Sequence, residues 1–124
     1  MWQRLSRNNG QMGEFMIISA RKKLPSISLD KEYVVLELGA SRNGDIYYRI
    51  ERDDRTPVLV KPEDFEVTSN KLPVSWIAQW LEVGSVIFCP LPWTRKDFWE
   101  RFFDREPEAE RIFKEERDKI ISQS

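Results

Sequence analysis

Residues 33–67 constrain the fold of this chain more than any other part of it. Short runs of β-branched and aromatic residues alternate there with turn residues, which is typical of antiparallel strands joined by tight turns. Asn43-Gly44 supplies the positive φ angles that a hairpin turn requires. The run 46–51 follows it and alternates strictly, so one face of this strand is expected to point into a core: Ile46, Tyr48 and Ile50.

Five strands and one helical turn are predicted around this stretch. The strands are expected at 15–20, 33–38, 46–51, 56–61 and 65–68. The helical turn at 62–64 begins with a proline, and the first residue of a helix needs no backbone N–H for the helical hydrogen bonds. Alternation favours one core face in the second strand: Val34, Leu36 and Leu38. The opposite faces of the second and third strands are expected to point outward: Tyr33, Val35, Glu37, Tyr47, Arg49 and Glu51.

Composition limits the chain to one ordinary globular domain. It has 124 residues, of which 40% are hydrophobic and 33% charged, enough for one sizeable core. The net charge of −1 gives no global attraction to nucleic acid or to an anionic membrane. Residues 1–14 are polar and lack periodicity, so they are expected to form a flexible leader.

Cysteine usage and hydropathy indicate the compartment. Cys89 is the one cysteine, so no intrachain disulfide framework exists. The polar N-terminus lacks the apolar segment of a secretory signal, and no apolar run approaches the roughly 20 residues of a membrane span. We expect a cytoplasmic protein without membrane contact.

Residues 69–124 are rich in aromatic side chains and predict a mainly helical extension, packed on residues 15–68 as one compact domain. The spacing favours helices at 75–81, 95–104 and 107–121, with a buried strand at 86–89. Thr94 and Asp97 have the spacing of a capping box for the second helix.

The order of these elements resembles a known superfold. Five short strands, a long early loop and a helical turn before the last strand resemble an SH3-like β-barrel over residues 15–68. The phrase RTPVLVKPEDFEV is similar to the end of small, uncharacterised bacterial and phage proteins with that barrel. The resemblance implies an α+β fold, a five-stranded barrel with a C-terminal helical segment packed on it, and it constrains fold more than activity.

The residue types exclude several classes of chemistry. Without histidine, the usual Ser-His-Asp and Cys-His catalysis is absent, and a single cysteine cannot supply a structural zinc site. Cys89 has apolar neighbours and is expected to be buried and unreactive. The adjacent carboxylates Asp53-Asp54 and Glu63-Asp64 are typical of turns. We therefore expect no catalytic residue, no cofactor and no metal ion, and hence no enzyme.

Aromatic residues provide the strongest indication of binding. Eight of the 15 aromatic residues lie between Trp76 and Phe103. Such residues dominate protein interfaces, but at helical spacing they are more often core, and both alternatives stay open. Trp93, between Pro92 and Thr94, is the aromatic residue expected to be most exposed. The complete set of candidate partner-binding residues is Trp93, Trp80, Tyr47, Tyr48 and Trp99.

Two functions are compatible with these features. The first is a non-catalytic protein-interaction module, in one version an immunity-type or regulatory protein. The alternative is an SH3-like barrel that binds RNA or another nucleic acid through cations and stacking rings. The residues that would serve this alternative are Arg21, Lys22, Lys23, Tyr47, Tyr48 and Arg49.

Overall fold

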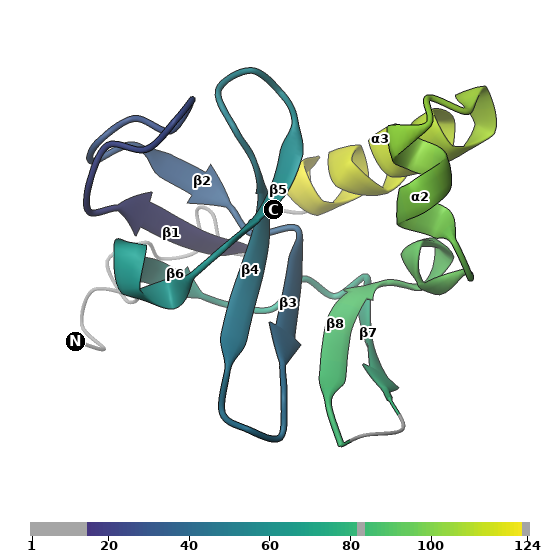
Figure 1. The fold of residues 1–124 in the computed structure, drawn as a ribbon, viewed down its shortest axis with the longest axis horizontal. Helices are drawn as coiled ribbons and strands as arrows, with labels where there is room; N and C mark the ends of the chain where they lie inside the picture. The colour runs from purple at the N-terminus through teal and green to yellow at the C-terminus, as the bar shows by residue number, and fades with distance from the viewer. Residues whose placement is uncertain (1–14, 82–83, 123–124) are drawn as a thin grey trace.

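The computed structural model describes residues 15–81 and 84–122, which form an α+β fold of two antiparallel sheets followed by helices (Figure 1). The first sheet has the order β2-β1-β6 and contains β1 (Met16–Ala20), β2 (Glu32–Val34) and β6 (Phe65–Asn70). The second has the order β5-β4-β3-β8-β7 and contains β3 (Glu37–Ala40), β4 (Ile46–Glu51), β5 (Pro57–Val60), β7 (Trp76–Trp80) and β8 (Val86–Pro90). A 3₁₀ turn, η1 (Pro62–Asp64), precedes β6 as the sequence predicts.

The two sheets meet at Val35 and Leu36, where one continuous segment passes from the first sheet to the second. The N–H of Val35 donates to the carbonyl of Met16 in β1 at 2.8 Å. The N–H of the next residue, Leu36, donates to the carbonyl of Arg49 in β4, also at 2.8 Å. Both side chains are fully buried, so this corner lies at the centre of the core.

The predicted strands between residues 15 and 68 are present, but the predicted closure into a barrel is wrong. The run 33–38 is two strands, β2 and β3, that belong to different sheets. The edge of β3 that faces away from β4 pairs with β8, through Leu38↔Phe88 and Ala40↔Val86. The hairpin β7–β8 thereby widens the second sheet, and the two sheets stay separate.

The same corner corrects the predicted faces. Tyr33, Val35 and Glu37 are buried, although alternation suggested the other face. A segment that changes sheet buries both of its faces, so a single alternating pattern cannot describe it. In β4, Ile46 is exposed near the hairpin tip and Arg49 is buried, the reverse of the prediction.

Residues 75–81 form no helix, which corrects a second prediction. They include β7, which pairs antiparallel with β8 from Trp76↔Pro90 to Trp80↔Val86. The apolar pattern of this short segment fits either period, and the complementary strand 86–90 decides the outcome. Gly84, with φ of 83°, lies in the turn that joins the two strands.

Three helical elements follow β8 in the described part of the chain. The turn η2 (Leu91–Thr94) leads into α2 (Phe98–Phe103), which is shorter than predicted. Thr94 does not cap α2, because its hydroxyl donates to the carbonyl of Leu91 at 2.7 Å. The last helix, α3 (Pro107–Ser122), confirms the prediction for 107–121.

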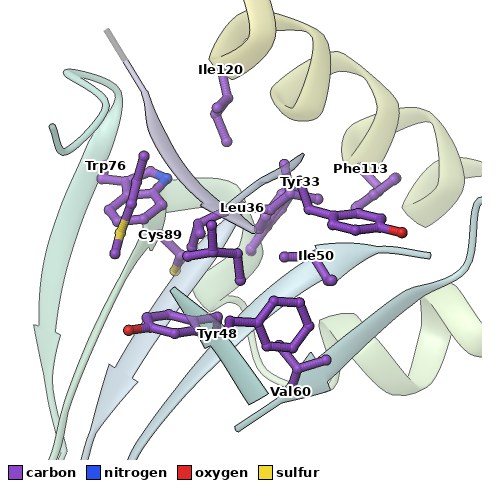
Figure 2. Packing of buried hydrophobic residues seen from close by; sticks show 14 of the residues in the cluster. Tyr33, Leu36, Tyr48, Ile50, Val60, Trp76, Cys89, Phe113 and Ile120 are labelled. Carbon is purple, nitrogen blue, oxygen red and sulfur yellow. The ribbon is translucent and has the colours of Figure 1, made fainter. Parts of the chain in front are cut away.

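Helix α3 closes one end of the core. Ile120 is fully buried, and Phe113 and Ile120 point toward the strands in Figure 2. Arg117 donates to Glu51 at the end of β4, with Nη1 2.9 Å from Oε2, which ties the helix to the second sheet. Among the residues described, no helix is long and apolar enough to span a membrane.

Candidate functional site

Trp93, expected from the sequence to be exposed, lies in the core instead. Its side chain is 3% exposed and its ring lies nearly parallel to those of Phe98 and Phe113, with centroids 6.3 and 5.3 Å away. Trp99 meets it edge-on at 5.4 Å. The aromatic cluster of residues 93–113 is therefore mainly the seam between α2, α3 and the sheet, which is one of the two alternatives that the sequence left open.

Two further candidates are also engaged within the molecule. Tyr48 is buried in the core. Tyr47 is partly buried and donates its hydroxyl to Glu37 Oε2 at 3.3 Å. These contacts give both tyrosines a packing role.

The cluster that sequence reasoning missed is a buried ion pair beneath α2. Glu37 and Arg49 are 3% and 7% exposed, face each other across β3 and β4, and place Oε1 3.6 Å from Nε. The guanidinium of Arg49 lies 3.8 Å from the ring centroid of Trp99, a cation–π contact with α2. The opposite charges of Glu37 and Arg49 indicate a pair only when the two residues are known to lie opposite each other on β3 and β4, and that register comes from the structure.

Burial dominates the electrostatics of this pair. Desolvation raises the pKa of Glu37, and the opposing effect of the Arg49 charge does not cancel it. Desolvation also lowers the pKa of the Arg49 guanidinium. Burial together with the Glu37 charge raises the pKa of Tyr47 to about 12. Because their contacts are with one another and with Trp99, these groups anchor α2 to the sheet.

Cys89 is buried at 2% exposure, as the sequence predicted. Burial, with the nearby Glu37 charge, raises the pKa of its thiol to about 12. The thiolate is the reactive form of cysteine, so the folded protein presents very little of it at neutral pH.

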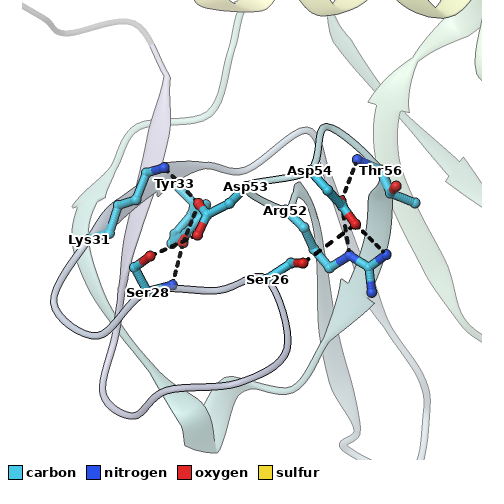
Figure 3. A network of polar contacts seen from close by, with 8 residues as sticks. All are labelled: Ser26, Ser28, Lys31, Tyr33, Arg52, Asp53, Asp54 and Thr56. Atoms are coloured by element: carbon cyan, nitrogen blue, oxygen red, sulfur yellow. Dashed lines mark hydrogen bonds and ion pairs between the residues drawn. The ribbon is translucent and has the colours of Figure 1, made fainter.

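The carboxylates of the turn 52–56 are held by hydrogen bonds within the fold (Figure 3). Asp53 accepts hydrogen bonds from Ser28 Oγ at 2.7 Å, Lys31 Nζ at 2.6 Å and Tyr33 Oη at 2.9 Å. The lysine contact is the largest cause that lowers the pKa of Asp53 to about 2. Asp54 accepts from the N–H of Thr56 at 3.1 Å. Asp54 thus makes the local turn contact that the sequence predicted, whereas the contacts of Asp53 join the turn to the loop between β1 and β2.

The residues proposed for nucleic-acid binding are not gathered on one open surface. Tyr48 and Arg49 are buried, so neither is free to stack on a base or to contact a phosphate. Lys22 pairs with Asp64, with Nζ 3.1 Å from Oδ1. Across the described ranges 15–81 and 84–122, no three carboxylate or cysteine side chains converge closely enough to hold a metal ion.

Trp80 is the candidate that the structure leaves open to a partner. It lies at the end of β7 and is 73% exposed. Strand β7 is the outermost strand of the five-stranded sheet and pairs, within the described part of the chain, with β8 alone. An unpaired sheet edge with an exposed indole is suited to binding another chain.

The backbone of this edge presents a defined pattern of donors and acceptors. The N–H of Leu81 donates to the carbonyl of Ser85 in the direction of β8 at 2.8 Å. Hydrogen-bonded and non-bonded positions alternate along an antiparallel ladder. Ile77 and Gln79 therefore direct their N–H and C=O groups toward β8, whereas Ala78 and Trp80 direct theirs toward the free edge.

A groove lies between the tips of the hairpins β3–β4 and β7–β8, at the end of the second sheet where Trp80 is found; Leu81 lines it, but no residue of β7 itself does. Its volume is about 900 Å³, and η1 forms part of its wall. Apolar side chains from both hairpins contribute to it: Ile46, Tyr47, Leu81 and Val86. The groove and Trp80 together make this end of the second sheet the candidate interaction surface.

Comparison of the chain with protein-family models, with curated proteins and with solved structures gives no match. The resemblance to small bacterial and phage SH3-like proteins thus stays a prediction about relatedness.

Proposed function

We propose that this chain is a non-catalytic protein-interaction module that binds its partner at the free edge of β7. The observation that carries the proposal is the 73% exposure of Trp80 on an outermost strand whose backbone groups at Ala78 and Trp80 face outward. Tryptophan is enriched among interface hot spots because it buries a large area at a small cost in rotamer entropy.

The neighbouring surface supports the same proposal. The groove at the Leu81 end of the second sheet has apolar residues from two hairpins, and its volume of about 900 Å³ is sufficient for side chains of a bound chain. The adjacent carboxylates Asp53 and Asp54 are engaged in contacts within the fold, Asp53 with Ser28 and Asp54 with Thr56. An immunity-type or regulatory protein is the specific version that small size and mixed charge favour.

Site-specific photo-crosslinking tests the proposal directly. A benzophenone amino acid replaces Trp80 in the full chain, which is expressed in cells of the organism that encodes it. The control places the same amino acid at Leu59, which is 51% exposed on β5, the opposite edge of the sheet. We expect a discrete adduct from position 80 and none of the same mass from position 59. Equal labelling at both positions, or none at position 80, would refute the proposed surface.

A further inference from the structure

We propose that the partner of the β7 edge is a second copy of this chain, whose own β7 adds to that edge in antiparallel orientation about a two-fold axis beside Gln79. The inference rests on the proposed function, since it names the partner of the same edge. The result would be one continuous sheet that runs through both copies.

The backbone groups at this edge are complementary to themselves. Ala78 and Trp80 each direct one N–H and one C=O toward the free edge, which makes two donors and two acceptors per copy. An antiparallel second copy that sets Ala78 opposite Trp80, and Trp80 opposite Ala78, pairs all of these groups in four hydrogen bonds. The N–H of Trp76 is outside this set because it already donates to the carbonyl of Pro73 at 3.1 Å.

The side chains fit the same register. Ala78 and Trp80 lie two residues apart and therefore on the same face of the sheet. Each indole would lie beside the small methyl group of Ala78 in the other copy, so that a large side chain meets a small one. On the opposite face Gln79 would meet its own copy, and two carboxamides can donate to and accept from each other.

Charge favours self-pairing as well. A residue next to a two-fold axis meets its own copy, so a charged residue there repels itself. Residues 76–81 contain no charged residue, no proline and no glycine. The other sheet edges carry features that discourage pairing: β2 contains Glu32, β5 begins at Pro57 and β6 contains Glu66. The edge of β7 is the one without such a feature in the described part of the fold.

Sedimentation or light scattering of the full chain gives the first test. Over a series from about 1 µM to about 1 mM, which spans weak to moderate association, we expect the mass to rise from 14.8 kDa toward twice that value. Ala78→Pro removes an outward N–H and leaves the ladder with β8 intact, so it should abolish the rise. Leu59→Lys, at the opposite edge, should not change it. A mass of 14.8 kDa throughout the series would overturn the inference.

Substitution of Gln79 by a positive residue in one variant and a negative residue in another tests the register. Its readout is the association of two folded variants, so it does not require either variant to be less stable than the wild type. Gln79→Lys and Gln79→Glu should each remain monomeric when alone, because like charges meet at the axis. An equimolar mixture of the two variants should form a heterodimer. Thermal melts of each variant confirm that it is folded before it is scored. Failure of the folded mixture to associate would overturn the proposed pairing.

The crosslinking experiment separates this inference from the proposed function. An adduct of two copies at position 80 supports both. An adduct with a different protein, from a chain that stays monomeric in the concentration series, overturns the pairing of copies and leaves the interaction module standing. No adduct at position 80 removes the proposed surface itself.

Discussion

Replacing Trp93 by alanine should destabilise the fold far more than replacing Trp80 by alanine, although the two substitutions are chemically identical. Trp93 is 3% exposed and stacks against Phe98 and Phe113, whereas Trp80 is 73% exposed. Truncation of a buried tryptophan to alanine costs about 3–5 kcal/mol through lost burial and a residual cavity. Only about a quarter of Trp80 is buried, so its truncation should cost less than about 1 kcal/mol.

One polar atom reduces the expected cost at Trp93. Its Nε1–H is buried and has no hydrogen-bond acceptor among the described residues. An unsatisfied buried donor costs about 1–3 kcal/mol, which the alanine variant no longer bears. We therefore expect Trp93→Ala to lower the free energy of unfolding by about 3 kcal/mol, near the low end of the range for buried tryptophan. Trp93→Phe keeps a ring and removes the donor, so it should lie within about 1 kcal/mol of the wild type.

Urea unfolding followed by far-UV circular dichroism measures these differences. A loss of 3 kcal/mol should lower the midpoint by about 1–2 M for a slope typical of a domain of this size. The protein is kept at about 1 µM so that association does not add to stability. Equal midpoints for Trp93→Ala and Trp80→Ala would refute the placement of Trp93 in the core.

Three further results are expected. Gly39→Ala should destabilise the fold by about 1–3 kcal/mol in urea unfolding, because the added Cβ would overlap the Tyr47 ring. The double variant Gly39→Ala/Tyr47→Ala should lose less stability than the sum of the two single variants, and strict additivity would contradict this contact. The pKa of Asp53 in the folded state is lowered to about 2 from 3.8, so its contribution to stability is full above pH 3.8 and is lost as the pH falls toward 2. The melting temperature should therefore fall less steeply with decreasing pH in Asp53→Asn than in the wild type. Identical pH dependence of the two melting temperatures would count against the network. The Cys89 thiol, whose pKa burial raises to about 12, should react with a disulfide reagent at pH 8 only as fast as the protein opens, and reaction at the rate of the denatured chain would contradict its burial.

Local pattern was sufficient for the last helix and for the strands β1, β4, β5, β6 and β8. The β-branched runs around Asn43-Gly44 and the proline at the start of α3 each specify an element within a few neighbouring residues. Contacts between distant segments decided the rest. Residues 75–81 are a strand because residues 86–90 pair with them, and a segment of that length carries no pattern that excludes a helix.

The candidate site shows the same division. Glu37 and Arg49 are polar residues on adjacent strands with an alternating pattern. Such a pattern indicates that the polar side chains are exposed to solvent, unless another layer covers their face of the sheet. Helix α2 supplies the layer through Trp99, some 50 residues later in the chain. Trp93 has polar and proline neighbours in sequence, but η2 turns its ring toward Phe113 in α3. Trp80 was named from its residue type, and its exposure follows from the position of β7 at the sheet edge.

Amide hydrogen exchange of four consecutive residues in β7, measured in the dilute monomer, tests the open edge most directly. Ile77 and Gln79 donate toward β8 and should be protected, whereas Ala78 and Trp80 face outward and should exchange at close to the rate of an unstructured chain. Comparable protection of all four amides would contradict the account, since a helix or a covering strand would give that result.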